Sequence, residues 1–215
     1  MTEAEVNHIL YEMTYDEYVD TLKAKYGAVP KDYFYFNKKG KLAKTSGITR
    51  GSEGLYIHHI YECYFIDLST PATYLSMCDY PQKYPDIENA QKAENLVYGN
   101  LMEHLILHIK IALEYQRQQY NVGIAFITRD INNLFDLSDK HLLETVYRAK
   151  NSLWKQAVYQ LIKDDYEIYV GLVKICINDL NIPITQVCST VDANLCPYPY
   201  QRLIQDVTEN SSSIQ

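Results

Sequence analysis

The first apolar residues of the chain are spaced as on one face of an amphipathic helix: Val6, Ile9, Leu10 and Met13. Thr14 followed by Glu17 is a capping-box pattern that opens a second helix over residues 15–26. Gly27 is a suitable end for that helix. The pattern therefore predicts one or two amphipathic helices within residues 3–26.

The next part of the chain alternates between short apolar runs and breaks. Residues 30–54 hold four glycines and predict a basic loop or hairpin region. Residues 55–61 are β-branched and aromatic and predict a short strand. Residues 63–93 hold three prolines, and because an unstructured loop of that length would be unusual, we expect a short helix inside it. Asn95 opens a second predicted strand over residues 95–98.

A longer apolar segment follows. Asn100 can cap a helix that runs from Leu101 to about residue 118. This helix is apolar almost all round, which is typical of a buried helix. His104 and His108 lie inside it and therefore need partners, because a buried imidazole without one is costly.

The C-terminal third predicts a helical layer. Ser138 can cap a helix over residues 139–163, and a further helix is expected over residues 165–180. Residues 182–215 contain three prolines and a serine-rich end, and we expect them to be irregular and partly disordered. The fold class that follows is α+β and predominantly helical.

Composition and cysteine content agree with an intracellular globular protein. The hydrophobic fraction is 47% and the charged fraction 22%, and no run of apolar residues has the length of a membrane span. The N-terminus is acidic and lacks the apolar core of a signal peptide. The five cysteines form no C-x-x-C pair, so we expect reduced thiols, with a disulfide among the last three left open. We expect a cytoplasmic protein that has no membrane partner.

Charge is distributed unevenly along the chain. The net charge is −7, but residues 23–50 carry eight basic residues against Asp32 alone, so this segment is +7 and the rest of the chain −14. A basic block can contact phosphates, or it can be a solvated loop. The candidate nucleic-acid contacts are Lys38, Lys39, Lys41, Lys44 and Arg50. Four aromatic residues at 33–36 precede the lysines and can stack on bases or pack one face of a strand.

Four of the six histidines fall into two pairs. His58 and His59 are adjacent on a predicted strand, so their side chains point to opposite faces. His104 and His108 are four residues apart on a predicted helix, so they share a face, with about 5–6 Å between their Cβ atoms. One strand histidine can join the helix pair around a single metal ion, with the other held beside it. Three ligands and an open position are what a hydrolytic metal centre needs.

The order of these motifs resembles a known family. His-His-Ile, then Asn-Leu-Val-Tyr, then His-x-x-x-His within residues 54–115 resembles the HNH nucleases, especially colicin-type DNases and phage-encoded HNH endonucleases. In that family strand, strand and helix form a ββα-metal finger. The resemblance implies such a finger in residues 54–120, embedded between N-terminal helices with a basic region (1–53) and a C-terminal helical layer (121–215). Residues 63–93 are then an insertion that is longer than in compact family members.

The resemblance also implies a role for each motif residue. His59 would be the general base that deprotonates water, and Asn95 would brace the loop and orient this base. The metal ligands would be His58, His104 and His108. Glu62 is either an outer partner of a ligand histidine or a plain loop carboxylate. The chain departs from some relatives in having no Cys-x-x-Cys pairs for a structural zinc.

The expected activity is hydrolysis of phosphodiester bonds by a metal-dependent endonuclease, with double-stranded DNA as the expected partner. Three imidazoles favour Zn²⁺, Ni²⁺, Co²⁺ or Mn²⁺ over Mg²⁺, and since family members differ in their metal, one ion of Zn, Mn, Ni or Mg is expected. The alternatives are a non-catalytic metal finger that binds DNA, and an RNase. Cutting both strands with one site per chain would favour a homodimer, and a phage or bacterial defence setting would suit such an enzyme.

Overall fold

The computed structural model describes residues 1–115, 121–139, 153–191 and 197–209 of the chain. Within these ranges the protein is mostly helical and has three two-stranded antiparallel sheets. The helices are α1 (Glu3–Tyr11), α2 (Tyr15–Tyr26), α3 (Pro71–Cys78), α4 (Leu101–Tyr115), α5 (Asn121–Asp139), α7 (Leu153–Ile162), α8 (Tyr166–Asn178), α9 (Ile184–Val187) and α10 (Gln201–Glu209). The strands are β1 (Phe34–Phe36), β2 (Leu42–Lys44), β3 (Tyr56–His59), β4 (Leu96–Gly99), β5 (Ser189–Val191) and β6 (Pro197–Pro199).

The N-terminal helices form as their sequence predicts. The Thr14 hydroxyl accepts a hydrogen bond from the Glu17 amide at 3.2 Å, and the Glu17 carboxylate accepts one from the Thr14 amide at 2.7 Å. Gly27 ends α2 with a φ of 81°, a conformation that favours glycine. The capping box and the helix end predicted from the sequence are confirmed.

The two predicted strands form as β3 and β4 and pair antiparallel, and the predicted helix follows directly as α4. His58 lies opposite Val97 and His59 opposite Leu96. The Asn100 side chain accepts a hydrogen bond from the Glu103 amide at 2.9 Å, which confirms the predicted cap of α4. Two short helices lead out of β3 and into β4: a 3₁₀ turn over Ile60–Cys63 and another over Ala93–Asn95. Asn95 therefore precedes the second strand rather than opening it.

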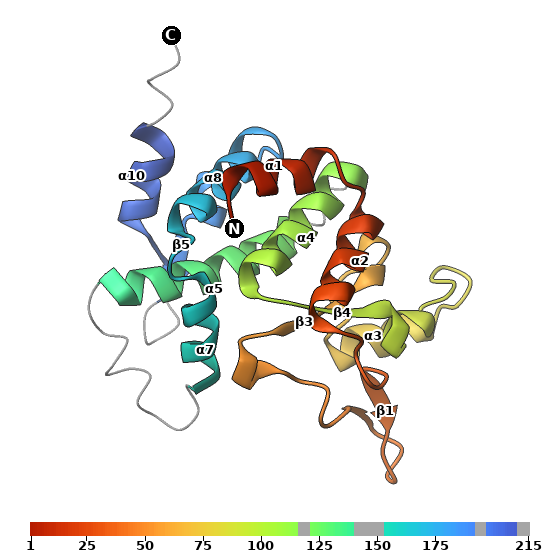
Figure 1. Cartoon of the computed structure of the whole chain (residues 1–215). Coiled ribbons are helices and arrows are strands. Elements are labelled where there is room, and N and C mark those ends of the chain that lie inside the picture. Colours follow the sequence, from red (N-terminus) through yellow and green to blue (C-terminus); the bar gives the residue numbers. More distant parts are fainter. Residues whose placement is uncertain (116–120, 140–152, 192–196, 210–215) are drawn as a thin grey trace.

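Helix α4 runs through the middle of the helical part of the molecule (Figure 1) and contacts α1, α2, α5, α7 and α8. Two buried polar groups fix its position. Glu103 accepts hydrogen bonds from Lys25 at 2.6 Å and Tyr26 at 2.8 Å, which joins α4 to α2. Lys110 is fully buried and donates to the carbonyl oxygens of Ile9 at 3.0 Å and Met13 at 2.6 Å, which joins α4 to the end of α1.

The apolar side chains form two clusters that meet at β4. The larger one packs the N-terminal helices, α4 and the C-terminal helices together, and it includes Val97. The smaller one gathers residues from Val29 to Tyr98, and it includes Leu96. Successive residues of β4 thus face different clusters, as strand geometry requires. The same alternation on β3 sends the neighbouring histidines in different directions.

Residues 30–54 contain a β1–β2 hairpin, in which Phe34 lies opposite Lys44. Asn37 shapes its turn by accepting hydrogen bonds from the backbone amides of Lys39 at 2.9 Å and Lys41 at 3.1 Å. The hairpin projects from the body of the molecule at the lower right of Figure 1. Helix α3 is the short helix that was expected within residues 63–93.

The C-terminal part corrects two expectations. Helix α5 runs through Ser138, so a helix capped there is wrong; residues 140–152, with His141, lie outside the described residues. The irregular structure expected for residues 182–215 is also wrong where the chain is described, because α9, β5, β6 and α10 lie there. The prolines of β6 are tolerated because a two-stranded ribbon has only edge strands. The helix expected over residues 165–180 is confirmed as α8.

Cys63, Cys78, Cys176 and Cys188 form no disulfide within the described residues, and Cys196 lies outside them. Across the described part of the chain, no helix combines the length and the apolar character needed to cross a bilayer.

Candidate metal centre

Three histidines from two elements face one another. His58 lies on β3, and His104 and His108 lie one turn apart on α4. The ring centroids are separated by 5.1 Å for His58–His104, 5.1 Å for His58–His108 and 5.0 Å for His104–His108. By these distances the three imidazoles form a nearly equilateral triangle. The histidines of β3 and α4 come together because β4 pairs with β3 and leads directly into α4.

Glu62 joins these histidines from the 3₁₀ turn that follows β3. Its Oε2 lies 3.1 Å from His108 Nε2 and 3.5 Å from His58 Nδ1. One donor atom from each of His58, Glu62, His104 and His108 lies within 4.8 Å of all the others, so the group could hold a metal ion. From the sequence, Glu62 was expected to be either an outer partner of a ligand histidine or a plain loop carboxylate. In the structure it lies among the potential metal ligands.

Two ring nitrogens of this group are buried, and the Glu62 carboxylate lies near only one of them. Nδ1 of His58 and Nδ1 of His104 make no hydrogen bond to any described residue. A buried polar atom left unpaired costs about 1–3 kcal/mol. A divalent cation would satisfy such atoms, and three imidazoles with one carboxylate are a donor set suited to Zn²⁺ and similar ions. The residues present therefore fit a metal ion.

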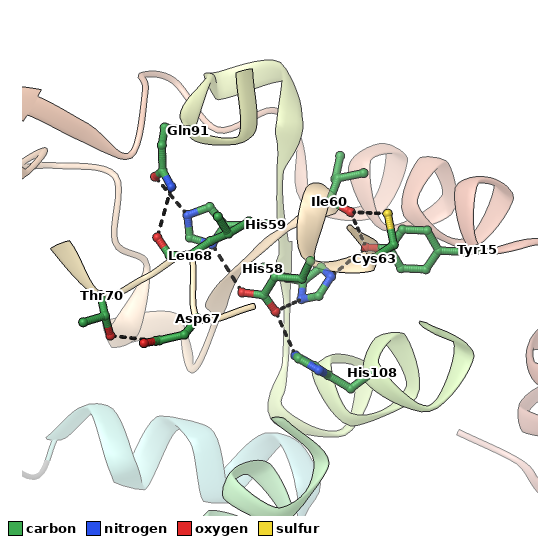
Figure 2. A network of polar contacts seen from close by, with 11 residues as sticks. Tyr15, His58, His59, Ile60, Cys63, Asp67, Leu68, Thr70, Gln91 and His108 are labelled. Carbon is green, nitrogen blue, oxygen red and sulfur yellow. Dashed lines mark hydrogen bonds and ion pairs between the residues drawn. The ribbon is translucent and has the colours of Figure 1, made fainter. Parts of the chain in front are cut away.

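Tyr15 of α2 fixes the protonation of His58. The Tyr15 hydroxyl lies 2.7 Å from His58 Nε2 and donates to the Ile60 carbonyl oxygen at 3.1 Å (Figure 2). Because that oxygen can only accept, the hydroxyl hydrogen is used there and His58 Nε2–H must donate to the hydroxyl. His58 Nδ1 then keeps its lone pair on the side of Glu62, in the form that a metal requires. Sequence reasoning missed Tyr15.

Burial sets the charges of the group. It lowers the pKa of His58 well below its ordinary value. Burial, together with the neighbouring His108, lowers the pKa of His104 to about 3. Burial alone would raise the pKa of Glu62, but the contacts with the His108 and His59 imidazoles outweigh it and hold this pKa well below the ordinary value. At neutral pH His58 and His104 are therefore neutral and Glu62 is ionised, which are the forms that bind metal.

His59 points away from the triangle toward the smaller apolar cluster. Its ring packs edge-on against Tyr33, with 4.4 Å between ring centroids. Its Nε2 lies 3.3 Å from Gln91 Oε1, and its Nδ1 lies 3.6 Å from Glu62 Oε1. The His59 ring therefore reaches the group through Glu62 without being part of it.

Gln91 determines which nitrogen of His59 is basic. The Gln91 amide nitrogen donates to the Leu68 carbonyl oxygen at 3.0 Å, so its oxygen is the atom that faces His59 (Figure 2). An oxygen accepts, so His59 Nε2 carries the hydrogen and Nδ1 keeps a lone pair on the side of Glu62. Gln91 is only 4% exposed and lies in the insertion, where no sequence pattern marked it.

Asn95, the residue expected to orient His59, bonds elsewhere. Its side-chain nitrogen donates to the Asn89 carbonyl oxygen at 2.8 Å. This bond braces the loop before β4, which is one half of the role that the resemblance implied. Among the described residues, the amide side chain that contacts His59 is that of Gln91. The orienting role of Asn95 stays a prediction.

Gly123 of α5 closes one side of the group. A Cβ atom at this position would lie 2.5 Å from His108 Nδ1, so a larger residue would push His108 or α5 away. The group is largely shielded from solvent, since the side chains of Glu62 and His108 are only 15% and 11% exposed.

The basic residues separate into two groups. Lys38, Lys39, Lys41 and Lys44 are exposed on the β1–β2 hairpin. Arg50 instead pairs with the Glu53 carboxylate and donates to the Tyr26 carbonyl oxygen at 2.6 Å. The guanidinium of Arg50 is thus engaged in holding α2 to the turn before β3, and its contact with phosphate stays a prediction.

The lowered pKa of His104 predicts that acid destabilises the metal-free protein. Between pH 6.5 and about 3 the unfolded chain binds a proton at residue 104 that the folded protein does not, so stability present above pH 6.5 is lost as the pH falls. In urea unfolding with a chelator, we expect wild type to lose about 1 kcal/mol per pH unit more than His104→Asn between pH 6 and 4. His8→Asn, at an exposed histidine, should behave as wild type. Equal slopes for wild type and His104→Asn would contradict the assignment.

No protein-family model, no curated protein and no solved structure matches the chain. What the protein does is therefore inferred from the geometry of this histidine–glutamate group and from its motifs.

Proposed function

We propose that the protein is a metal-dependent endonuclease of the HNH type, in which β3, β4 and α4 act as a ββα-metal finger. One observation carries this proposal: three imidazoles converge while the adjacent His59 is held apart by its own hydrogen bond. A structural metal site has no use for a separately oriented histidine. A hydrolytic site needs one as a base.

His58, His104 and His108 would hold one divalent ion, with Glu62 as a further donor. This set favours Zn²⁺, Mn²⁺ or Ni²⁺ over Mg²⁺. When bound, the cation supplies positive charge that stabilises the phosphate and the leaving oxygen. Tyr15 contributes by holding His58 in the tautomer that presents Nδ1.

His59 would act as the general base through Nδ1. This atom takes a proton from a water molecule while the water oxygen attacks phosphorus and the bond to the 3′ oxygen breaks. Gln91 accepts the hydrogen of Nε2 and so keeps Nδ1 free to receive the proton. The Glu62 carboxylate, 3.6 Å from Nδ1, stabilises the imidazolium that results. The products carry 5′-phosphate and 3′-hydroxyl ends.

DNA is the substrate that the resemblance implies, with RNA as the alternative. The exposed lysines 38, 39, 41 and 44 supply phosphate contacts that do not depend on base sequence.

A second candidate is a structural metal finger that binds nucleic acid without cleaving it. The position of Glu62 favours this reading, because three histidines and one carboxylate make four ligands, and structural zinc sites are closed by four. In a nuclease Glu62 must give way to water or substrate. Metal binding that is never accompanied by cleavage would identify the structural finger.

We expect the purified protein to nick supercoiled plasmid DNA in the presence of Mn²⁺, Zn²⁺ or Ni²⁺, and to be inactive with a chelator. His59→Ala should lower the rate by about 10²–10⁴-fold, the usual contribution of a general base. His8→Ala, which changes an exposed histidine far along the chain from both motifs, should cleave like wild type. Gel electrophoresis measures the rate, and end-labelling identifies the product ends.

Two outcomes would contradict this mechanism. Full activity in His59→Ala would remove its base, and 3′-phosphate products would exclude departure of the 3′ oxygen. A parallel assay with RNA distinguishes the DNase from the RNase.

Gln91→Leu tests how the base is oriented. Because Gln91 contacts His59 and not the triangle, we expect cleavage to slow by about ten- to a hundredfold with the metal content unchanged. Gln205→Leu, at an exposed glutamine of α10, serves as the matched control. An unchanged cleavage rate in Gln91→Leu would show that this hydrogen bond does not matter to catalysis.

A further inference from the structure

The β1–β2 hairpin carries exposed aromatic side chains to which the cleavage mechanism assigns no role. Two aromatic side chains are solvent-exposed there, Tyr35 by 50% and Phe36 by 64%. Exposed lysines lie at the turn and on β2: Lys38, Lys39, Lys41 and Lys44. No acidic residue occurs between positions 33 and 52. This segment therefore combines exposed rings with positive charge that nothing on the hairpin itself neutralises.

The two rings lie on opposite faces of a narrow ribbon. Tyr35 pairs with Ala43 and Phe36 with Leu42, and successive residues of a strand point to opposite sides. Neither ring is covered by its small or half-buried cross-strand neighbour. Exposed apolar side chains beside charge are typical of a binding surface rather than of a folded core.

The base of the hairpin is connected to the candidate metal centre. Lys44 Nζ lies 4.4 Å from the centroid of the Tyr33 ring, and that ring packs against His59. The Tyr33 amide donates to the Gln91 carbonyl oxygen at 2.8 Å. Phe36 lies three residues beyond Tyr33, about 10 Å at the rise of a strand. The hairpin is thus linked to His59 by direct packing through Tyr33.

We propose that the β1–β2 hairpin is an arm that binds single-stranded nucleic acid, with Tyr35 and Phe36 stacking on unpaired bases and the lysines contacting phosphates. The proposal rests on the endonuclease function and narrows its substrate to nucleic acid that contains an unpaired segment. Lysines provide the electrostatic attraction to a polyanion. Aromatic rings provide stacking, which every base accepts on its face.

An unpaired strand fits this surface better than a duplex does. In a duplex the base faces are covered by neighbouring pairs, and sequence is read by amide and guanidinium groups in a groove. Asn37, the amide side chain at the turn, already uses its oxygen to accept two backbone hydrogen bonds. What the hairpin offers freely is rings and ammonium groups.

Fluorescence anisotropy tests the arm on the full chain, in EDTA so that no cleavage occurs. The probes are a labelled oligonucleotide, single-stranded or annealed to its complement. We expect tighter binding to the single strand, and a loss of about fivefold to a hundredfold in Phe36→Ala and Tyr35→Ala. Phe36→Leu should lose nearly as much, because it keeps apolar volume without a stacking face. Tyr80→Ala, which removes an equally exposed ring on another segment, should bind like wild type.

Replacing Lys38, Lys39 and Lys41 together by Gln should make binding less sensitive to salt. Each lost phosphate contact removes about 0.7 from the slope of log affinity against log salt for a single strand, so we expect a decrease of about 2. Circular dichroism of each variant checks that the fold is intact.

Equal binding by wild type and both aromatic variants, or tighter binding to the duplex, would overturn the proposal that the hairpin binds single-stranded nucleic acid. These outcomes are separable from the fate of the nuclease. Cleavage that persists in Tyr35→Ala and Phe36→Ala at unchanged affinity would reject the arm and leave the nuclease standing. If binding depends on Tyr35 and Phe36 but the protein cleaves nothing with any metal, the arm stands and the nuclease is rejected.

Discussion

The fold removes a group of polar side chains from water. The structure depends on partners that offset the free-energy cost of burying them. Three imidazoles and the carboxylate of Glu62 face one another, where an unpaired polar atom is costly. Each element around them supplies part of the compensation: α2 provides the Tyr15 hydroxyl for His58, and the insertion provides Gln91 for His59. Burial keeps His104 neutral, and the ionised Glu62 lies between the histidines. Two ring nitrogens still make no hydrogen bond to any described residue, and a metal ion could satisfy them.

Local sequence patterns predicted most of the helices and strands. They could not predict contacts between residues that are far apart in the sequence. The capping box of Thr14 and the pair His104 and His108 could be recognised because helical spacing joins residues three or four apart. Tyr15 contacts a histidine 43 residues away and Gln91 one 32 residues away, and no periodicity encodes such pairs. Helix α5 was missed although its apolar residues have helical spacing, because Ser138 suggested a helix start. The C-terminal prolines suggested irregular structure, whereas a two-stranded ribbon accommodates them.

Residues 63–93 and the basic β1–β2 hairpin meet at His59. Tyr33 packs against its ring, Gln91 holds its Nε2, and the Tyr33 amide donates to the Gln91 carbonyl oxygen. The segments that lie outside the recognised motifs are therefore the ones that orient the proposed base. The triangle does not depend on residues 63–93 for its ligand histidines, since all three come from β3 and α4. In the proposed enzyme, these histidines hold the metal and the surrounding segments orient the base.

The central claim is that His58, His104 and His108 bind a metal while His59 stays free. Isothermal titration with Zn²⁺, with the bound metal measured by mass spectrometry, tests it directly on wild type and single alanine variants. We expect one ion per chain in wild type and in His59→Ala. We expect a loss of tight binding in His58→Ala, His104→Ala and His108→Ala. Unchanged affinity in His104→Ala, or loss of the ion in His59→Ala, would rule out this assignment of ligands and base.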